Sequence, residues 1–196
     1  MKPWEKIGPP QVIAKKYGIS LLLQKFFRPE QQAEIDWALV SGDGKTVVIF
    51  PITKNLEVVA IKEFKCGSNE TMVQLPCGNA EQNETHREAA ARELEEETGY
   101  RAKTVRYLAH QKSIYFEPTH VEGKYAAVLA RDCTYTGKLR LDETEDIETA
   151  IIPLEQWMEM IWRGEVTDSK SIAVTLLALG SLEAPELKEL VKKIGK

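Results

Sequence analysis

The sequence predicts an α+β fold, in which helices flank a mixed β-sheet and an antiparallel β extension precedes that sheet. Residues 12 to 64 alternate runs of β-branched and aromatic residues with glycine, serine and asparagine turns, a pattern typical of consecutive strands. A charged segment from Glu84 to Thr98 has a helical composition and stops at Gly99. Prolines and glycines then mark the ends of further helices toward the C-terminus.

The expected strands are separated by recognisable turns. Tyr17-Gly18, the Ser41 to Gly44 stretch and Lys54-Asn55 carry residues that favour reversals of the chain. The strands expected before the charged helix cover residues 12–16, 20–28, 34–40, 46–53, 56–64 and 72–75, and those after it cover 103–113, 125–130 and 148–152.

Three helices are expected after the last strand. Pro153 fits the first turn of a helix that runs to Arg163 and is closed by a glycine. Asp168 or Ser169 caps a second helix, through about residue 182. Pro185 opens a third, in which apolar residues recur with the i, i+3, i+4, i+7 spacing of an amphipathic helix.

The composition excludes several classes of protein. The formal net charge is −4, and no basic stripe of the kind that binds nucleic acid is present. Three cysteines without paired spacing, Cys66, Cys77 and Cys133, argue against a disulfide framework or a zinc site and favour the cytoplasm. No apolar run reaches membrane-spanning length, and the first residues lack a signal core, so we expect no membrane partner.

The charged helix concentrates carboxylates on one face. With ~100° of rotation per residue, Glu97 lies about 40° from Glu93, and Glu96 lies about 60° from it on the other side. One interpretation is a solvated acidic helix with internal pairs such as Glu88–Arg92. The other is a site for a hard divalent cation, which takes oxygen ligands and offsets the repulsion between carboxylates. The charge run alone leaves both interpretations open.

The spacing around this helix resembles the Nudix box. Gly78 is followed after five residues by Glu84 and after seven more by Arg92-Glu93-Leu94, and the segment ends with Glu96-Glu97, one residue, and Gly99-Tyr100. Every defined position of the box is matched. The resemblance implies a Nudix fold, an α/β/α sandwich around a mixed sheet, and a metal-dependent hydrolase that cuts a diphosphate linkage.

The resemblance also implies roles for single residues. Glu93 and Glu97 are expected to be the principal Mg²⁺ ligands, Glu96 to serve a second metal, and Arg92 to orient the glutamates. Mn²⁺ is the alternative ion. The backbone carbonyl of Cys77 is a further candidate metal ligand, whereas the Cys77 thiol is not expected to react. We interpret Glu84 as a structural or capping residue.

The surroundings of the box resemble ADP-ribose and nucleoside-diphosphate-sugar pyrophosphatases. Gln74-Leu75-Pro76-Cys77-Gly78 is similar to their Glu-Leu-Pro-Ala-Gly, with glutamine in place of glutamate and cysteine in place of alanine. Lys62-Glu63-Phe64-Lys65 stands where those enzymes have Arg-Gln-Tyr-Arg, so Lys65 keeps the charge but loses the bidentate fork. We expect Lys65 and Gln74 to contact the substrate.

An acidic loop near residue 144 is the expected source of the general base. Residues 142–148 and 164–173 resemble the end of ADP-ribose pyrophosphatases, and the resemblance implies that Glu143 activates the attacking water while Glu145 assists at the metal cluster. An ordinary acidic surface loop is the alternative interpretation.

Further substrate contacts are expected outside the box. Glu122 follows Pro118, in the loop that marks the subgroup. Phe27, or Trp4 or Phe26, is a candidate to stack on the nucleobase, with Arg28 beside it, although packing explains each of them too. The N-terminal extension, residues 1–45, loosely resembles the segment through which these enzymes dimerise, and residues 46–196 form the hydrolase domain.

The sequence therefore predicts a homodimeric enzyme that hydrolyses ADP-ribose or a related nucleoside diphosphate sugar, which is a small-molecule substrate. GDP-mannose, ADP-glucose, UDP-sugars and damaged nucleotides are alternative substrates. A nucleotide-sensing module is an alternative from another class, which the complete set of box glutamates disfavours, and the acidic balance disfavours RNA decapping.

Overall fold

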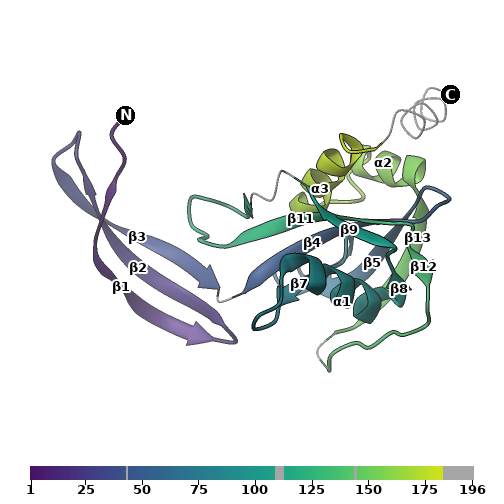
Figure 1. The fold of residues 1–196 in the computed structure, drawn as a ribbon. Helices are drawn as coiled ribbons and strands as arrows, with labels where there is room; N and C mark the ends of the chain where they lie inside the picture. The colour runs from purple at the N-terminus through teal and green to yellow at the C-terminus, as the bar shows by residue number, and fades with distance from the viewer. Residues whose placement is uncertain (43, 109–112, 144, 183–196) are drawn as a thin grey trace. The chain divides into compact units, whose positions relative to one another are not determined.

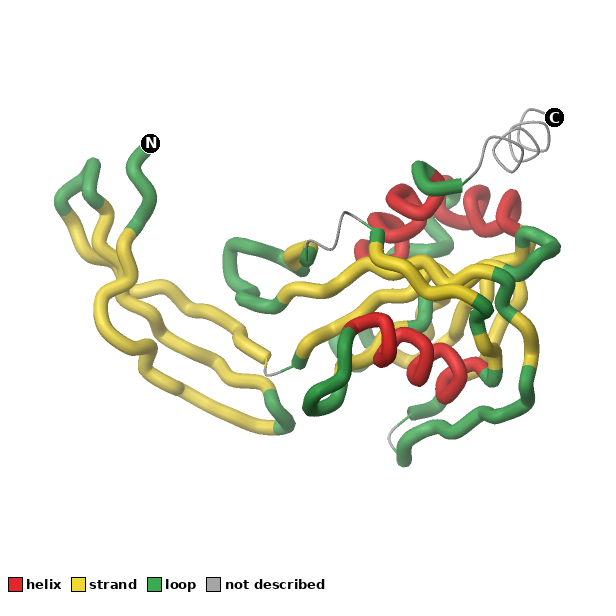
Figure 2. The backbone as a smooth tube through the Cα atoms, viewed as in Figure 1, coloured by secondary structure: helices red, strands yellow, loops and turns green. Residues whose placement is uncertain are grey.

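A computed structural model describes residues 1–42, 44–108, 113–143 and 145–182 of the chain, which form two compact units. The first unit combines Met1–Gly44 with Ile114–Tyr125, and the second contains Lys45–Ser113 and the chain from Ala126 onward. Strands and loops build the first unit, and the helices of the described chain belong to the second (Figures 1 and 2).

The first unit is a three-stranded antiparallel sheet in the order β1-β2-β3. Its strands are β1 (Glu5–Lys16), β2 (Ile19–Arg28) and β3 (Ala33–Gly42). The 116–123 loop lies along β3, because the Val40 amide donates to the His120 carbonyl at 2.7 Å and the Glu122 amide donates to the Val40 carbonyl at 2.9 Å. The outer edge of β3 is therefore covered, whereas every residue of β1 is exposed.

A mixed sheet has the strand order β10-β11-β4-β5-β13, to which β6, β7 and β9 add by pairing with β5, β4 and β11. β10 and the first two residues of β11 are counted with the first unit, and the other strands of this sheet build the second unit. Two further short strands, β8 and β12, pair with each other. The strands are β4 (Lys45–Ile52), β5 (Glu57–Lys65), β6 (Glu70–Gln74), β7 (Cys77–Ala80), β8 (Tyr100–Arg101), β9 (Thr104–Tyr107), β10 (Ile114–Tyr115), β11 (Lys124–Arg131), β12 (Thr134–Tyr135) and β13 (Ile147–Pro153).

Both faces of the central strands are buried. Alternate side chains of a strand point to opposite faces, and in β4 Val47 and Ile49 pack in one cluster with Leu94 of helix α1 (His86–Thr98). The intervening residues, Val48 and Phe50, are equally buried. Because α3 (Ser169–Leu179) also contacts β4, the sheet is enclosed by helices on both faces, as the predicted sandwich requires.

The C-terminal helices are tied to the strand that leads into the box. The chain enters α2 (Leu154–Trp162) from β13 and then α3, where the Asp168 side chain caps the helix by accepting from the Ser171 amide. The Ser171 hydroxyl in turn accepts from the amide of Leu75 at 2.8 Å. This buried link fixes the 74–78 segment against α3.

A membrane span would need a longer and more apolar helix than any that the described residues form.

Most expected elements are confirmed, and the differences have physical reasons. The first strand begins at Glu5 rather than residue 12, because Gly8 with φ of 64° and a register shift carry pairing past the prolines. The predicted 103–113 strand is wrong in length: β9 ends at Tyr107, and residues 109–112 lie outside the described chain. The helix expected from Pro185 lies outside the described residues.

The structure also corrects the residues around the turn into the box helix. Cys77 and Gly78, expected with Pro76 to end the 72–75 strand, instead begin a further strand, β7, which pairs with β4. The helix begins at His86 rather than Glu84, and its N-cap is Thr85. The Thr85 hydroxyl accepts from the Glu88 amide, while Glu88 accepts from the Thr85 amide at 2.9 Å, which completes a capping box.

This cap yields a stability prediction. Replacing Thr85 with alanine leaves the Glu88 amide without its side-chain partner, so the free energy of unfolding falls by about 1 kcal/mol. For a chain of this size the melting temperature falls by roughly 2–4 °C. Thermal unfolding followed by circular dichroism measures the change, with Thr85→Ser as the control that keeps the cap. Equal melting of T85A and the wild type would contradict the role of the cap.

Candidate active site

The site is formed where β7 turns toward α1 and the two elements touch. A Cβ atom built on Gly78 would lie 2.1 Å from the carboxyl carbon of Glu93 and 2.2 Å from its Oε1. A side chain at this position would displace the Glu93 carboxylate, so glycine lets that carboxylate rest on the backbone of the strand. This close approach of the Glu93 carboxylate to Gly78 explains why the box begins with a glycine.

A single guanidinium holds the acidic face of α1 in place. Arg92 makes two bonds to Glu84, at 2.9 and 3.1 Å, and its Nη2 also donates to the Asn79 carbonyl at 2.9 Å. Its Nη1 lies 3.0 Å from both Glu93 and Glu96. These partners raise the pKa of Arg92. Glu84 is thus the structural anchor of Arg92, and the expected orienting role of Arg92 corresponds to these contacts.

Glu97 is the most buried carboxylate of the site. Its side chain is 4% exposed and accepts from the Cys77 amide at 3.1 Å. Burial, followed by the charges of Glu93 and Glu145, raises its pKa to about 9. Burial likewise raises the pKa of the Cys77 thiol to about 12, which agrees with an unreactive sulfur.

A cavity of about 620 Å³ opens beside this helix. Glu93, Glu96 and Arg92 line it, together with Glu145 and Asp142 of the acidic loop. Glu145 is anchored there because its carboxylate accepts from the Asp142 amide at 3.0 Å. Glu143 is exposed and is not among the residues that line the cavity.

The β5–β6 hairpin supplies a polar cluster close to Glu97. Gln74 is 1% exposed and donates to Glu63 at 3.0 Å, and the Lys65 ammonium lies 2.6 Å from the same carboxylate oxygen. The charge of Glu63 is one of the causes that raise the pKa of Glu97. The structure thus brings together Lys65 and Gln74, the two residues of this hairpin that were expected to contact the substrate. Glu63, which joins them, was not predicted from the sequence. The alternation along β5, which places residues 63 and 65 on one face, was the signal that could have found it.

The box residues have the donor chemistry of a divalent-metal site, although their side chains are not gathered around one point. Among the described residues no group of three acidic, histidine or cysteine side chains is close enough together to hold a metal, and Arg92 pairs with Glu93 and Glu96. The donors nevertheless suit a hard cation, because carboxylates line one cavity and the glycine cradle at Gly78 positions one of them. Glu93, Glu96 and Glu97, with the Cys77 carbonyl, are the residues that would hold the ion.

The remaining predicted contacts lie in the first unit. Glu122 lines a second cavity, together with Phe26 and Trp4. Phe27 is not among its lining residues, as expected for a neighbour of Phe26 on a strand whose side chains alternate. Arg28 packs its guanidinium over the Trp4 ring, 5.2 Å from the ring centroid.

Comparison with known proteins identifies the class of this chain: residues 42–173 match the NUDIX domain, and the chain belongs to that family. Nudix hydrolases generally use divalent metal ions. The helix-flanked sheet and the N-terminal strands also match a solved structure, the crystal structure of an ADP compounds hydrolase, with a TM-score of 0.78 at 20% identity, covering 100% of this chain and 97% of that one.

Two relatives of known name show which kinds of enzyme the chain is similar to. The ADP-ribose pyrophosphatase of Bacillus subtilis is 30% identical over 126 residues, which is 64% of this chain and 66% of that protein. The GDP-mannose pyrophosphatase of Escherichia coli K12 is 29% identical over 158 residues, 76% of this chain and 77% of that protein. The chain is therefore similar to pyrophosphatases that are named for two different nucleotide sugars.

Burial of Glu97 predicts that the site destabilises the metal-free protein. Its pKa rises from 4.5 to about 9 on folding, so the folded state binds the extra proton and loses stability as the pH rises between these values. In EDTA at pH 8, Glu97→Gln should raise the free energy of unfolding by about 1–3 kcal/mol, and the gain should vanish near pH 4.5.

The matched control is Glu95→Gln on the same helix. Glu95 bonds to Arg101, which lowers its pKa, so neutralising it brings no gain at pH 8. Urea unfolding of the three proteins at both pH values provides the comparison. A Glu97→Gln protein less stable than the wild type at pH 8 would show that the burial of Glu97 is not a burden on the fold.

Proposed function

We propose that the protein hydrolyses the diphosphate linkage of ADP-ribose or a related nucleoside diphosphate sugar with Mg²⁺, giving a nucleoside monophosphate and a sugar phosphate. The observation that carries the proposal is the seating of Glu93 on Gly78, beside Glu96 and the buried Glu97. Three carboxylates on one helix face, two of them held by Arg92, repel one another unless cations join them.

The bound Mg²⁺ would neutralise charge on the diphosphate and lower the pKa of a water molecule. The protein's own residues have distinct tasks. Arg92 keeps Glu93 and Glu96 aligned through bonds of 3.0 Å, so neither carboxylate must be ordered when the substrate binds. Arg140 adds positive charge at the cavity, 3.7 Å from Glu96.

The acidic loop would supply the proton acceptor. Glu145 lines the cavity beside Glu93, which supports its proposed assistance at the metal cluster. Glu143, exposed on the same loop, is proposed as the base that takes the proton from the attacking water. A loop suits a base, since it can bring a carboxylate to the water when the substrate is bound.

ADP-ribose is the first candidate substrate, because the loop that resembles ADP-ribose pyrophosphatases lies at the cavity and the Bacillus relative bears that name. GDP-mannose is the second candidate. Its support is the E. coli relative, whose similarity extends over 76% of this chain rather than 64%.

Turnover and mutation test this proposal. The wild type with Mg²⁺ should convert ADP-ribose, or another member of a nucleotide-sugar panel, to a monophosphate and a sugar phosphate detected by chromatography. Glu143→Gln should lower kcat by about 10²- to 10⁴-fold at saturating Mg²⁺. Glu145→Gln should instead raise the Mg²⁺ concentration needed for half-maximal rate.

Glu148→Gln, which removes an exposed carboxylate bonded to Lys62, is the control and should keep wild-type turnover. The opposite pattern, with Glu145→Gln losing kcat at every Mg²⁺ concentration and Glu143→Gln fully active, would exchange the two roles. Tight nucleotide binding without any product across the panel would favour the sensing module over the enzyme.

We also propose that the protein is a homodimer, paired through its N-terminal strands. β1 is an edge strand with Ile7, Val12 and Ile13 exposed by 36, 57 and 52%. A long edge with apolar side chains is a template for pairing with another strand. Sedimentation equilibrium should give twice the 22.2 kDa chain mass, and Ile13→Lys should shift the protein toward the monomer. A wild type of single-chain mass at micromolar concentration would refute the dimer.

A further inference from the structure

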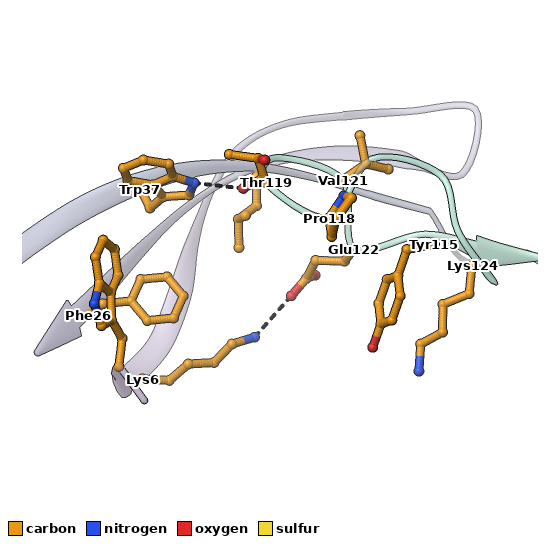
Figure 3. Close-up of a pocket in the computed structure, with 11 residues that line it drawn as sticks. Lys6, Phe26, Trp37, Tyr115, Pro118, Thr119, Val121, Glu122 and Lys124 are labelled. Carbon is orange, nitrogen blue, oxygen red and sulfur yellow. Dashed lines mark hydrogen bonds and ion pairs between the residues drawn. The ribbon is translucent and has the colours of Figure 1, made fainter. Parts of the chain in front are cut away.

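The first unit contains a cavity of about 470 Å³, formed between the N-terminal sheet and the 115–124 segment (Figure 3). All of its lining residues belong to this one unit. The volume is in the range of small-molecule sites, which combine an apolar lining with a few placed polar groups. The box and its carboxylates are not part of it.

Aromatic rings line one side of the cavity. Trp4 meets Trp37 edge to face, with ring centroids 5.9 Å apart, and meets Phe26 in the same way at 6.2 Å. Trp37 is fixed because its indole donates to the Thr119 carbonyl at 2.8 Å and its ring stacks on His120 at 5.2 Å. Such a cluster offers flat apolar surface to a planar ligand, and its position is set by bonds rather than by packing alone.

An ion pair provides the polar groups. In Figure 3 the Lys6 ammonium and the Glu122 carboxylate meet between the aromatic cluster and Tyr115, with a separation of 3.0 Å. Glu122 is held by its backbone, since its amide donates to the Val40 carbonyl. The hydrogen bond from Lys6 keeps the pKa of Glu122 below its ordinary value, so its oxygens only accept hydrogen bonds. The Lys124 ammonium lies over the Tyr115 ring, 5.3 Å from its centroid.

We propose that this cavity binds a guanine base and that Lys6 and Glu122 read its edge. Guanine carries two adjacent donors, N1–H and N2–H₂, which a carboxylate can accept together, and beside them the O6 acceptor, which suits an ammonium donor. The Lys6–Glu122 pair presents this complementary set while the ion pair stays intact. This inference rests on the proposed function in that the base belongs to a nucleotide substrate or product, and it ranks a guanine nucleotide such as GDP-mannose ahead of ADP-ribose among the candidates.

Other bases match the pair less well. Adenine offers one donor group, N6–H₂, and its N1 is an acceptor that an ionised carboxylate repels. Uracil offers a single donor and a smaller ring to the aromatic side chains. A two-point contact with the right base edge is worth about 1–3 kcal/mol of discrimination, which corresponds to roughly 5- to 150-fold in affinity.

The experiment measures nucleotide binding without metal and without turnover. Quenching of tryptophan fluorescence, checked by calorimetry, gives Kd values for GMP, AMP and UMP in EDTA. The wild type should bind GMP at least about 5-fold more tightly than AMP. Glu122→Gln, which replaces one acceptor oxygen by a donor, should remove that preference by weakening GMP while changing AMP little. Lys6→Met should also reduce the preference, through the lost O6 contact.

Glu34→Gln is the matched control. Glu34 forms a similar exposed ion pair with Lys25 at 3.2 Å on the same sheet, and neither residue lines the cavity. It should keep the GMP preference, and unchanged melting of all variants confirms their folding. Equal affinities for GMP and AMP in the wild type, or a preference that survives Glu122→Gln, would overturn the inference. The hydrolysis assay is separate from the binding assay. A protein without hydrolase activity could still prefer GMP, and a hydrolase without a GMP preference would refute only the inference about the base.

Discussion

The pairing of one guanidinium with the acidic face of α1 is the interaction on which the site depends. The helix carries carboxylates at 93, 96 and 97, and like charges at this spacing destabilise an isolated helix. Arg92 offsets that repulsion by contacting Glu93 and Glu96 directly, and Glu84 and the Asn79 carbonyl prevent it from turning away. The loop before the helix and the helix itself are therefore joined through a single side chain, which explains why box residues far apart in sequence act as one structural unit.

The fold holds these charges in place at a cost. Glu97 is buried with the Cys77 amide as its hydrogen-bond donor, and burial outweighs that single bond in setting its pKa. The surrounding anchors are correspondingly rigid: β7 pairs with β4, and the 74–78 segment is bonded to α3 through Ser171. A cation bound beside the Glu97 carboxylate should therefore stabilise the protein, because the anchored elements around Glu97 cannot move to expose its charge to water.

The sequence predicted those features that depend on local patterns. Spacing alone identified the box helix, its glycine end and the carboxylate face, and alternation identified the central strands. Features that depend on contacts between distant segments were missed: Glu63 acquires its importance only when β5 and β6 pair, and the 114–125 segment joins the N-terminal sheet through Val40. The choice between Phe26 and Phe27 needed the register of β1 and β2, which a one-residue shift would reverse.

In the proposed function, the two units separate the hydrolysis from the choice of base. The box carboxylates would act on a diphosphate, a group shared by all nucleotide sugars, and nothing in their geometry distinguishes adenine from guanine. The aromatic cavity of the first unit contains groups that can make this distinction, because an acceptor and a donor 3.0 Å apart match the edge of a base rather than a phosphate. The proposed choice of base therefore rests on the side chains of this cavity rather than on the box carboxylates.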